Sequence, residues 1–179
     1  CAQGGTCAIG DTGPGGGIVF YVASTNFTST GSDCGTECKY LEAAPTDHPT
    51  QIAWCSDTTS ALGTTATAVG TGMANTTTAD GTCTSGAIQT AADYTNNGKT
   101  DWHLPSKDEL NELCKYARTR EGQTSCQGTG TTRTGFSTGI YWSSSEDGAG
   151  TARSRSFSTG LAYFSLKTNP HYVRPVRAF

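Results

Sequence analysis

Eight cysteines in a chain of 179 residues constrain this protein more than any other feature of its sequence. Cysteines at this density are typical of proteins from oxidising compartments, where they form disulfides. Eight cysteines allow about 105 pairings, and the sequence alone does not choose among them. Because a short loop costs the least entropy to close, we expect each cysteine to pair with its neighbour in the chain. The predicted disulfides are Cys1–Cys7, Cys34–Cys38, Cys55–Cys83 and Cys114–Cys126.

The composition indicates one globular domain over residues 1–179. The chain is 34% hydrophobic and has 23 glycines, which together approach the apolar share of ordinary globular proteins. Only 15% of the residues are charged, so we expect a surface rich in threonine, serine and asparagine. A surface of such low charge argues against a nucleic-acid partner. The longest apolar run, residues 18–23, is too short to span a membrane.

Charges are divided unevenly along the chain. Residues 1–112 carry three basic and twelve acidic side chains, whereas residues 113–179 carry nine basic and three acidic ones. A basic C-terminal third on an acidic protein is a candidate face for an anionic partner. The alternative is that the two parts neutralise each other in the fold, and we favour that interpretation.

Two helices are predicted in the middle of the chain. Ser85 can cap the first, which ends before the Asn-Asn-Gly of residues 96–98. Ser106 and Glu109 have the spacing of a capping box and mark the start of the second. Apolar residues then recur at helical spacing, at Leu110, Leu113, Cys114 and Ala117.

Two segments rich in small residues are predicted to be irregular. Residues 56–84 are expected to form a long loop that Cys55 and Cys83 tie at its base. The glycine-rich residues 10–17 precede an apolar run, residues 18–22, that is typical of a buried strand. A phosphate-binding loop follows a strand and opens a helix, which is the opposite order. We therefore interpret these glycines as a turn with close backbone packing.

The C-terminal part is predicted to be a terminal antiparallel meander. Residues 141–143 and 153–157 have strand character, and the turn at 158–160 leads into a return strand over 161–167. Residues 172–179 would add a third strand, and each strand would keep one face open to water. With the two helices, this arrangement predicts an α+β fold with long disulfide-tied loops.

No catalytic pattern stands out in the sequence. Gly-x-Ser-x-Gly is absent, and His48, His103 and His171 stand in unrelated contexts. Since nucleophilic catalysis by serine or cysteine needs a base beside the nucleophile, we expect no hydrolytic triad.

Metal binding has only weak candidates. Zinc needs closely spaced cysteines and histidines, and only Cys34 and Cys38 approach that spacing. Asp93, Asn97 and Asp101 have the oxygen spacing of the first part of a calcium loop, but the last position of that loop is not a glutamate. We therefore expect no cofactor, with a calcium ion at these three residues as the alternative.

Surface recognition is the chemistry that the C-terminal residues suit best. Aromatic rings stack on the apolar faces of sugars, while cationic side chains bind sulfate or carboxylate groups. The alternative is that the aromatic side chains belong to the core and the arginines only solubilise one face. The candidate ligand-binding residues are Trp142, Arg153, Arg155, Tyr163, Lys167 and His171.

Several motifs occur together along nearly the whole chain. They are IGDTGPGGGIVFY at residues 9–21, YLEAAP at 40–45, DWHLPS with Glu109 and Leu110 at 101–110, YWSSS at 141–145 and VRPVR at 173–177. This set resembles the C-terminal domain of the Legionella collagen-like adhesin. That bacterial family has a C-type-lectin-like fold, which it shares with the formylglycine-generating, sulfatase-modifying enzymes.

The resemblance implies a C-type-lectin-like domain whose N- and C-terminal strands pair and whose long loops carry recognition. It implies an extracellular, non-enzymatic adhesin or receptor-binding module for glycans or another cell-surface ligand. The related oxidases use a cysteine pair near their C-terminal strands, whereas the last cysteine here is Cys126. The alternative function is a self-associating structural subunit of a bacterial surface filament or a phage appendage.

Overall fold

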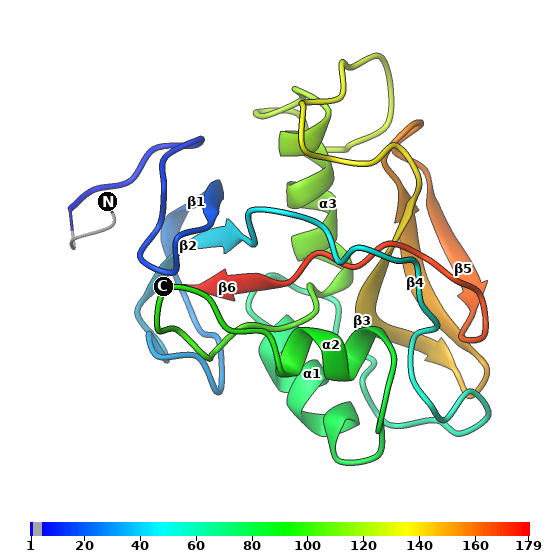
Figure 1. The fold of residues 1–179 in the computed structure, drawn as a ribbon. Coiled ribbons are helices and arrows are strands. Elements are labelled where there is room, and N and C mark those ends of the chain that lie inside the picture. Colours follow the sequence, from blue (N-terminus) through cyan, green and yellow to red (C-terminus); the bar gives the residue numbers. More distant parts are fainter. Residues whose placement is uncertain (2–4) are drawn as a thin grey trace.

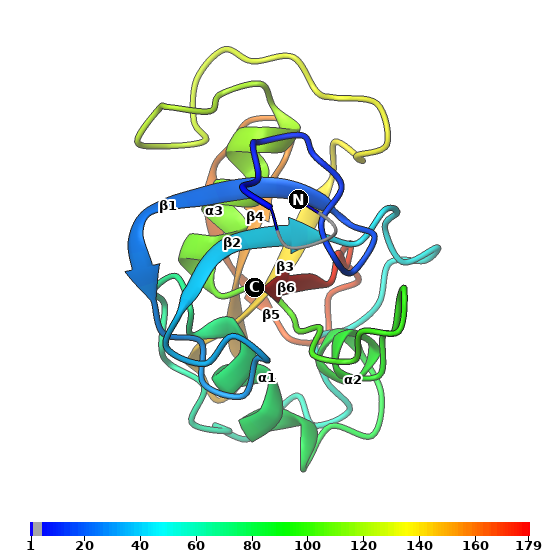
Figure 2. The ribbon, with the colours of Figure 1, turned by 90° about the vertical axis from the view of Figure 1, so that its left-hand side faces the viewer.

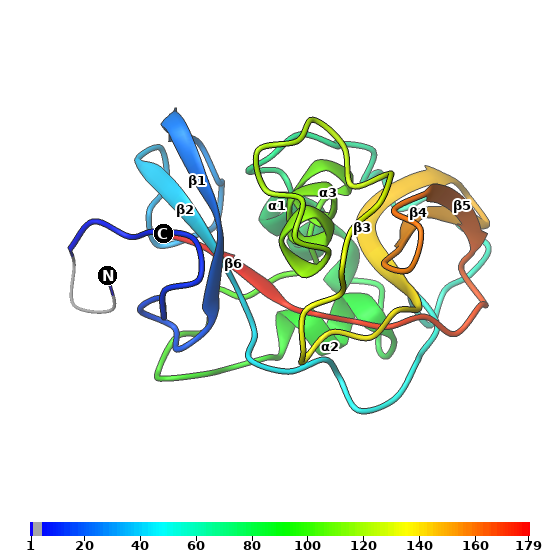
Figure 3. The same ribbon diagram turned by 90° about the horizontal axis from the view of Figure 1, so that it is seen from above.

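The structure, a computed structural model, describes residue 1 and residues 5–179. Two three-stranded antiparallel sheets lie on either side of a helical layer (Figures 1 and 3). Helix α3 lies between them and contacts β1 on one side and both β3 and β4 on the other. The elements are β1 (Ile18–Phe27), β2 (Cys38–Ala43), α1 (Gly72–Asp80), α2 (Ala87–Ala92), α3 (Lys107–Ala117), β3 (Ile140–Gly148), β4 (Thr151–Ser156), β5 (Ala162–Leu166) and β6 (Val176–Ala178).

Helix α3 begins as its sequence predicts. The Ser106 side chain accepts a hydrogen bond from the Glu109 backbone N–H, and the Glu109 side chain accepts one from the Ser106 backbone N–H. This capping box satisfies two of the four N–H groups that a helix start leaves without an internal partner. The apolar stripe then packs into a core shared with Phe20, Leu41 and Val176 of the first sheet. Helix α3 therefore joins the two sheets through one hydrophobic face.

A second core lies beside α2. Trp54 and Trp142 are fully buried there with Ile88 and Val173. The indole N–H of Trp54 donates to the Ser143 carbonyl at 2.8 Å, and that of Trp142 to the Ile52 carbonyl at 2.9 Å. Both large rings are thus buried without leaving their one donor unpaired.

The first sheet has the strand order β1-β2-β6 (Figure 2). Strand β6 pairs with β2, with Leu41 opposite Ala178 and Ala43 opposite Val176. The prediction that residues 172–179 add a third strand to the C-terminal meander was therefore wrong. Both faces of β6 are buried, and the strand is held in the first sheet by β2 and by the His103 bridge to Val176. The N-terminal β1 lies in the same sheet but is separated from β6 by β2, so the two do not pair directly.

The second sheet has the order β3-β4-β5 and contains the predicted hairpin over residues 153–167. The expectation that each of its strands keeps one face open to water was wrong for β3, most of which is buried on both faces. One face packs against α3 and the other belongs to the second core, so little of the strand is left for solvent. The outer edge of β3 is also covered, because the N–H groups of Trp142, Ser144 and Glu146 donate to the carbonyls of Tyr172, Pro105 and Thr64.

The segment over residues 56–84 is more regular than its composition indicates. It contains α1, a helix of nine residues built largely from threonine and alanine. The structure thus has three helices rather than the predicted two among the residues that it describes. Helix α2 starts after Gly86 with no side-chain cap, so the prediction of Ser85 as its cap was wrong. Gly86 has a φ of 98°, a conformation that favours glycine over serine.

All eight cysteines are in disulfides, and each is bonded to its neighbour in the sequence. This agrees with the prediction from loop entropy. The longest loop joins Cys55 to Cys83 and spans the segment that contains α1. The bonds are Cys1–Cys7, Cys34–Cys38, Cys55–Cys83 and Cys114–Cys126.

The glycine-rich residues 10–17 hold a carboxylate of the protein itself. The N–H groups of Gly15 and Gly17 donate to the two oxygens of Glu42, at 2.8 and 2.9 Å. Glu42 is fully buried and pairs with Arg177, which also contacts Asp101. The close backbone packing predicted for these glycines therefore serves a buried ion pair.

Pairs of this kind neutralise the uneven charge of the chain. Arg174 contacts Asp47, and Arg177 contacts Asp33, Glu42 and Asp101, so basic residues of the C-terminal part meet acidic residues of the N-terminal part. Both arginines are almost completely buried. The favoured interpretation of the charge pattern is therefore confirmed for these residues.

Candidate functional site

Four of the six predicted ligand-binding residues are buried. Trp142 packs against His171 with the ring planes tilted and the ring centres 4.4 Å apart, and burial lowers the pKa of His171. The guanidinium of Arg155 donates to the Gly160 carbonyl at 2.7 Å. Lys167 is inaccessible to solvent and lies 2.5 Å from a Glu146 carboxylate oxygen. These four side chains already have partners within the protein.

Arg153 and Tyr163 are the two predicted residues with substantial solvent access. Arg153 lies 2.7 Å from an Asp147 oxygen, and its guanidinium stands over the ring of Phe164 at 4.1 Å. Tyr163 is on β5 and is 38% exposed. Because β4 and β5 place these two side chains on opposite faces of the sheet, they do not form one site.

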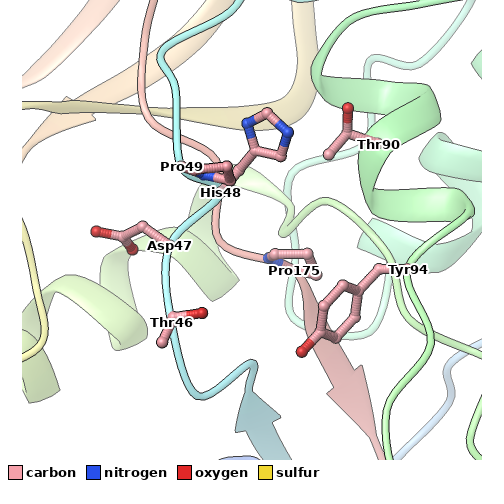
Figure 4. A pocket seen from close by; sticks show the side chains of 7 residues that line it. All are labelled: Thr46, Asp47, His48, Pro49, Thr90, Tyr94 and Pro175. Atoms are coloured by element: carbon pink, nitrogen blue, oxygen red, sulfur yellow. The ribbon is translucent and has the colours of Figure 1, made fainter.

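A hollow in the surface lies elsewhere, between the segment that follows β2 and helix α2 (Figure 4). Its volume is about 130 Å³, which is room for a few water molecules or for one small group of a ligand. Three distant parts of the chain meet there. The residues that line it are Thr46, Asp47, His48, Pro49, Thr90, Tyr94 and Pro175.

The hollow combines an apolar lining with a few polar groups. The ring of Tyr94 is held edge-to-face against the buried Trp102, with ring centres 5.1 Å apart, and burial raises the pKa of Tyr94. His48 Nδ1 lies 2.9 Å from the Thr50 carbonyl, which can only accept, so Nδ1 carries the proton and Nε2 is left as an acceptor in the neutral ring. Hydroxyl and imidazole groups beside a tyrosine ring suit hydrogen bonding to a neutral polyol.

The one carboxylate of the lining points away from the hollow (Figure 4). Asp47 accepts hydrogen bonds from the Tyr141 hydroxyl at 2.6 Å and from Arg174 at 3.0 Å. Burial, together with the hydrogen bond to Asp47, raises the pKa of Tyr141. Asp47 therefore positions the segment beneath the hollow, and its oxygens face the protein interior.

The three residues of the calcium alternative have other contacts. Asp93 caps the C-terminal end of α2, and the Asn97 amide donates to the Pro14 carbonyl at 2.9 Å. Asp101 accepts from Arg177 and from the Asp33 backbone N–H. In the described part of the chain, no three His, Cys, Asp or Glu side chains form a group that could hold a metal ion. The expected absence of a cofactor stays a prediction, with calcium at Asp93, Asn97 and Asp101 as its alternative.

Sequence reasoning missed the hollow because its residues belong to no single motif. Thr46–Pro49 follow β2, Thr90 is on α2, and Pro175 precedes β6. Only the hydrogen bonds of the fold, such as that from the His48 N–H to the Val173 carbonyl, bring these segments together. Of the lining residues, only Pro175 lies inside one of the motifs described above, VRPVR at residues 173–177.

The fold thus defines a disulfide-bonded α+β domain with two antiparallel sheets. The sequence matches the Lcl C-terminal domain family over residues 43–177, which is most of the chain. The chain belongs to this family. No curated protein matches the sequence.

A solved structure shares the fold. It is the crystal structure of a fimbrial protein from Bacteroides ovatus, with a TM-score of 0.57 and 19% sequence identity. The match covers 91% of this chain and 44% of the fimbrial protein, so the chain spans less than half the length of that protein. Helices long and apolar enough to cross a membrane do not occur among the residues that the structure describes.

Proposed function

We propose that this chain is an extracellular, non-enzymatic binding module of the adhesin type, which folds as one domain over residues 1–179 and recognises glycans. The observation that carries the proposal is the hollow beside Tyr94, because it offers a tyrosine ring and several neutral hydrogen-bonding groups on an open surface. Membership of the Lcl C-terminal domain family supports the surface location. The four disulfides support an oxidising compartment.

We also assign the C-type-lectin-like fold that the motifs imply. The arrangement that supports it is the first sheet, in which N-terminal and C-terminal strands lie together. Binding rather than catalysis is supported by the orientation of Asp47, since the carboxylate nearest the hollow is already occupied by Tyr141 and Arg174.

A glycan array tests the proposal. We expect binding to one class of glycan, and we expect Tyr94→Ala and His48→Ala to weaken it at least tenfold. Arg153→Ala and Tyr163→Ala are the matched controls, because they alter solvent-accessible residues of the second sheet that do not line the hollow. Circular dichroism confirms that each variant is folded. No binding to any glycan, heparin-like chains included, contradicts the function. Binding that is lost only in the Arg153 and Tyr163 variants places the site on the second sheet instead.

A second candidate function is a self-associating structural subunit of a surface filament or phage appendage. The specific observation in its favour is an exposed apolar stretch on β5, where Phe164 is 61% and Leu166 is 57% exposed. The solved structure that shares the fold is described as a fimbrial protein, which agrees with this candidate.

A further inference from the structure

Strand β5 ends the second sheet with an open edge. In its pairing with β4, Ser156 donates to Leu161 and Lys167 donates to Gly150. Hydrogen-bonded pairs alternate along an antiparallel ladder, so Leu161, Tyr163, Ser165 and Lys167 turn their backbone groups toward β4. The backbone groups of Ala162, Phe164 and Leu166 therefore point outward.

These outward groups are largely unpaired within the described structure. Only the Leu166 carbonyl has a partner there, the N–H of Asn169 at 2.9 Å. The side chains of the same three residues share one face of the sheet, and all three are exposed. Figure 1 shows β5 at the outer side of its sheet, with no segment of the chain beyond it. An apolar edge strand of this kind is a template for another strand.

We propose that β5 pairs antiparallel with β5 of a second copy of this chain, about a two-fold axis at Phe164. In this register Phe164 lies opposite Phe164 of the partner copy, and Ala162 lies opposite Leu166. All three are outward-facing positions, so Phe164–Phe164 and Ala162–Leu166 become hydrogen-bonded pairs. The Leu166 carbonyl would accept a second hydrogen bond there, besides that from the Asn169 N–H. This inference rests on the second candidate function, that copies associate, and is independent of glycan recognition.

The side chains favour a copy of the same strand over an unrelated one. A large residue meets a small one at each flanking pair, since Leu166 lies opposite Ala162 and Tyr163 lies opposite Ser165. The two phenylalanine rings meet at the centre, where a cross-strand aromatic pair is favourable. The strand therefore complements itself in size.

The charges also permit this pairing. Strand β5 carries no ionisable group other than the Tyr163 phenol. Two cations of β4 lie on the same face. Arg153 is neutralised by Asp147 at 2.7 Å, and Arg155 is buried and donates to the Gly160 carbonyl. Three strand spacings, about 14 Å, would separate the two copies of Arg153, which is beyond the screening length at physiological salt. No two like charges therefore lie close together across this contact.

Cross-linking tests the register directly. Because all eight cysteines are in disulfides, a Phe164→Cys variant has a single free thiol. Paired Cα atoms at a hydrogen-bonded position are about 5.5 Å apart, which is within disulfide range. We expect Phe164→Cys to give a covalent dimer under mild oxidation, and Ala162→Cys mixed with Leu166→Cys to cross-link faster than either alone. Val22→Cys, at an exposed apolar position on β1 in the other sheet, is the matched control. Equal cross-linking of the control, or no cross-linking of Phe164→Cys, overturns the proposal.

Sedimentation equilibrium of the unmodified chain tests the β5 pairing separately from the second candidate function, self-association of the chain. An interface of one short strand is small, so we expect a weak dimer, visible only toward about 1 mM. Phe164→Lys, which sets two ammonium groups opposite each other, should leave a monomer, whereas Val22→Lys should not. A dimer that Phe164→Lys leaves intact means that copies associate through another surface, so the β5 pairing falls and the candidate function stands. A monomer at every concentration removes both.

Discussion

Arg177 and Glu42 lie 135 residues apart in the sequence and meet in the interior, with Arg177 Nη1 3.2 Å from Glu42 Oε1. Neither side chain is more than 2% exposed. Asp101 contacts Arg177 from the other side, and the N–H groups of Gly15 and Gly17 complete the shell around Glu42. Four of the five motifs that carry the family resemblance thus contribute residues to one buried ionic cluster. Their role in this chain is to hold the first sheet against the loops.

Removing one partner of this pair should destabilise the protein strongly. Glu42→Gln leaves the Arg177 guanidinium with one fewer buried counter-charge, and breaking a buried pair costs about 3–5 kcal/mol. Urea unfolding followed by circular dichroism measures the change. Lys99→Ala is the control, because it breaks the partly exposed pair with Asp33 and should cost less than about 1 kcal/mol. Similar losses in the two variants would contradict the importance of the buried cluster.

Gly15 should not tolerate a side chain. A Cβ atom there would lie 2.7 Å from both Glu42 Oε1 and Trp102 Cζ2. Both neighbours are buried, so Gly15→Ala should cost about 1–3 kcal/mol through overpacking. Gly81→Ala provides the comparison, since Gly81 has a φ of −58° and open space around it. We expect Gly81→Ala to be neutral or to stabilise by up to about 1 kcal/mol in the same urea assay. A Gly15→Ala protein as stable as the unmodified chain would show that the cluster can move aside.

The Glu146–Lys167 pair should make stability depend on pH. Burial alone raises the pKa of Glu146, but hydrogen bonds from Lys167 and from the N–H groups of Leu62 and Thr64 outweigh it, so the pKa lies below the ordinary value of 4.5. A carboxyl with a lowered pKa in the folded state contributes stability above its unfolded pKa and loses it as the pH falls through the folded value.

Urea unfolding between pH 7 and pH 3 measures this contribution. Glu146→Gln should be less stable than the unmodified chain at pH 7 and should lose less stability on acidification. Asp93→Asn, which changes an exposed carboxylate, should keep the original dependence. Parallel acid profiles for the unmodified chain and Glu146→Gln would contradict the role assigned to this pair.

The four disulfides should contribute unequally. The Cys55–Cys83 bond closes a sequence separation of 28 residues, whereas Cys34–Cys38 closes one of four. From the loop-entropy relation, replacing the first pair with alanines should cost about 3.5 kcal/mol and the second about 2 kcal/mol. Thermal and urea unfolding of the two double variants measure the difference. A larger loss from the Cys34 and Cys38 replacement would mean that packing at Cys38, rather than chain entropy, dominates.

Local signals in the sequence predicted much of this fold. The capping box of Ser106 and Glu109 depends only on residues three positions apart, and the disulfides depend only on short loops between neighbouring cysteines. The hairpin over residues 153–167 is likewise local. Helix α1 was missed because its threonines and alanines form no amphipathic stripe, so the surrounding fold stabilises it.

Contacts between residues far apart in the chain could not be predicted from the sequence. Strand β6 has the alternation of a sheet strand, but nothing in its residues says that β2 rather than β5 is its partner. Burial of Arg155 and Lys167 was equally invisible, since charged side chains are seldom buried unless partners such as Gly160 or Glu146 are near. The hollow beside Tyr94 depends on both kinds of contact.

The covered edge of β3 limits how far the second sheet can be extended by strands from other copies. The N–H groups of β3 already donate to Tyr172, Pro105 and Thr64. Two copies joined through β5 would therefore form a six-stranded sheet with a covered β3 strand at each edge. A third copy could not extend that array by strand addition, and the runaway polymerisation typical of amyloid is blocked at the dimer. A filament built from such dimers would therefore need a second, different contact to add each further dimer. A substitution could then block filament elongation without blocking dimer formation through β5.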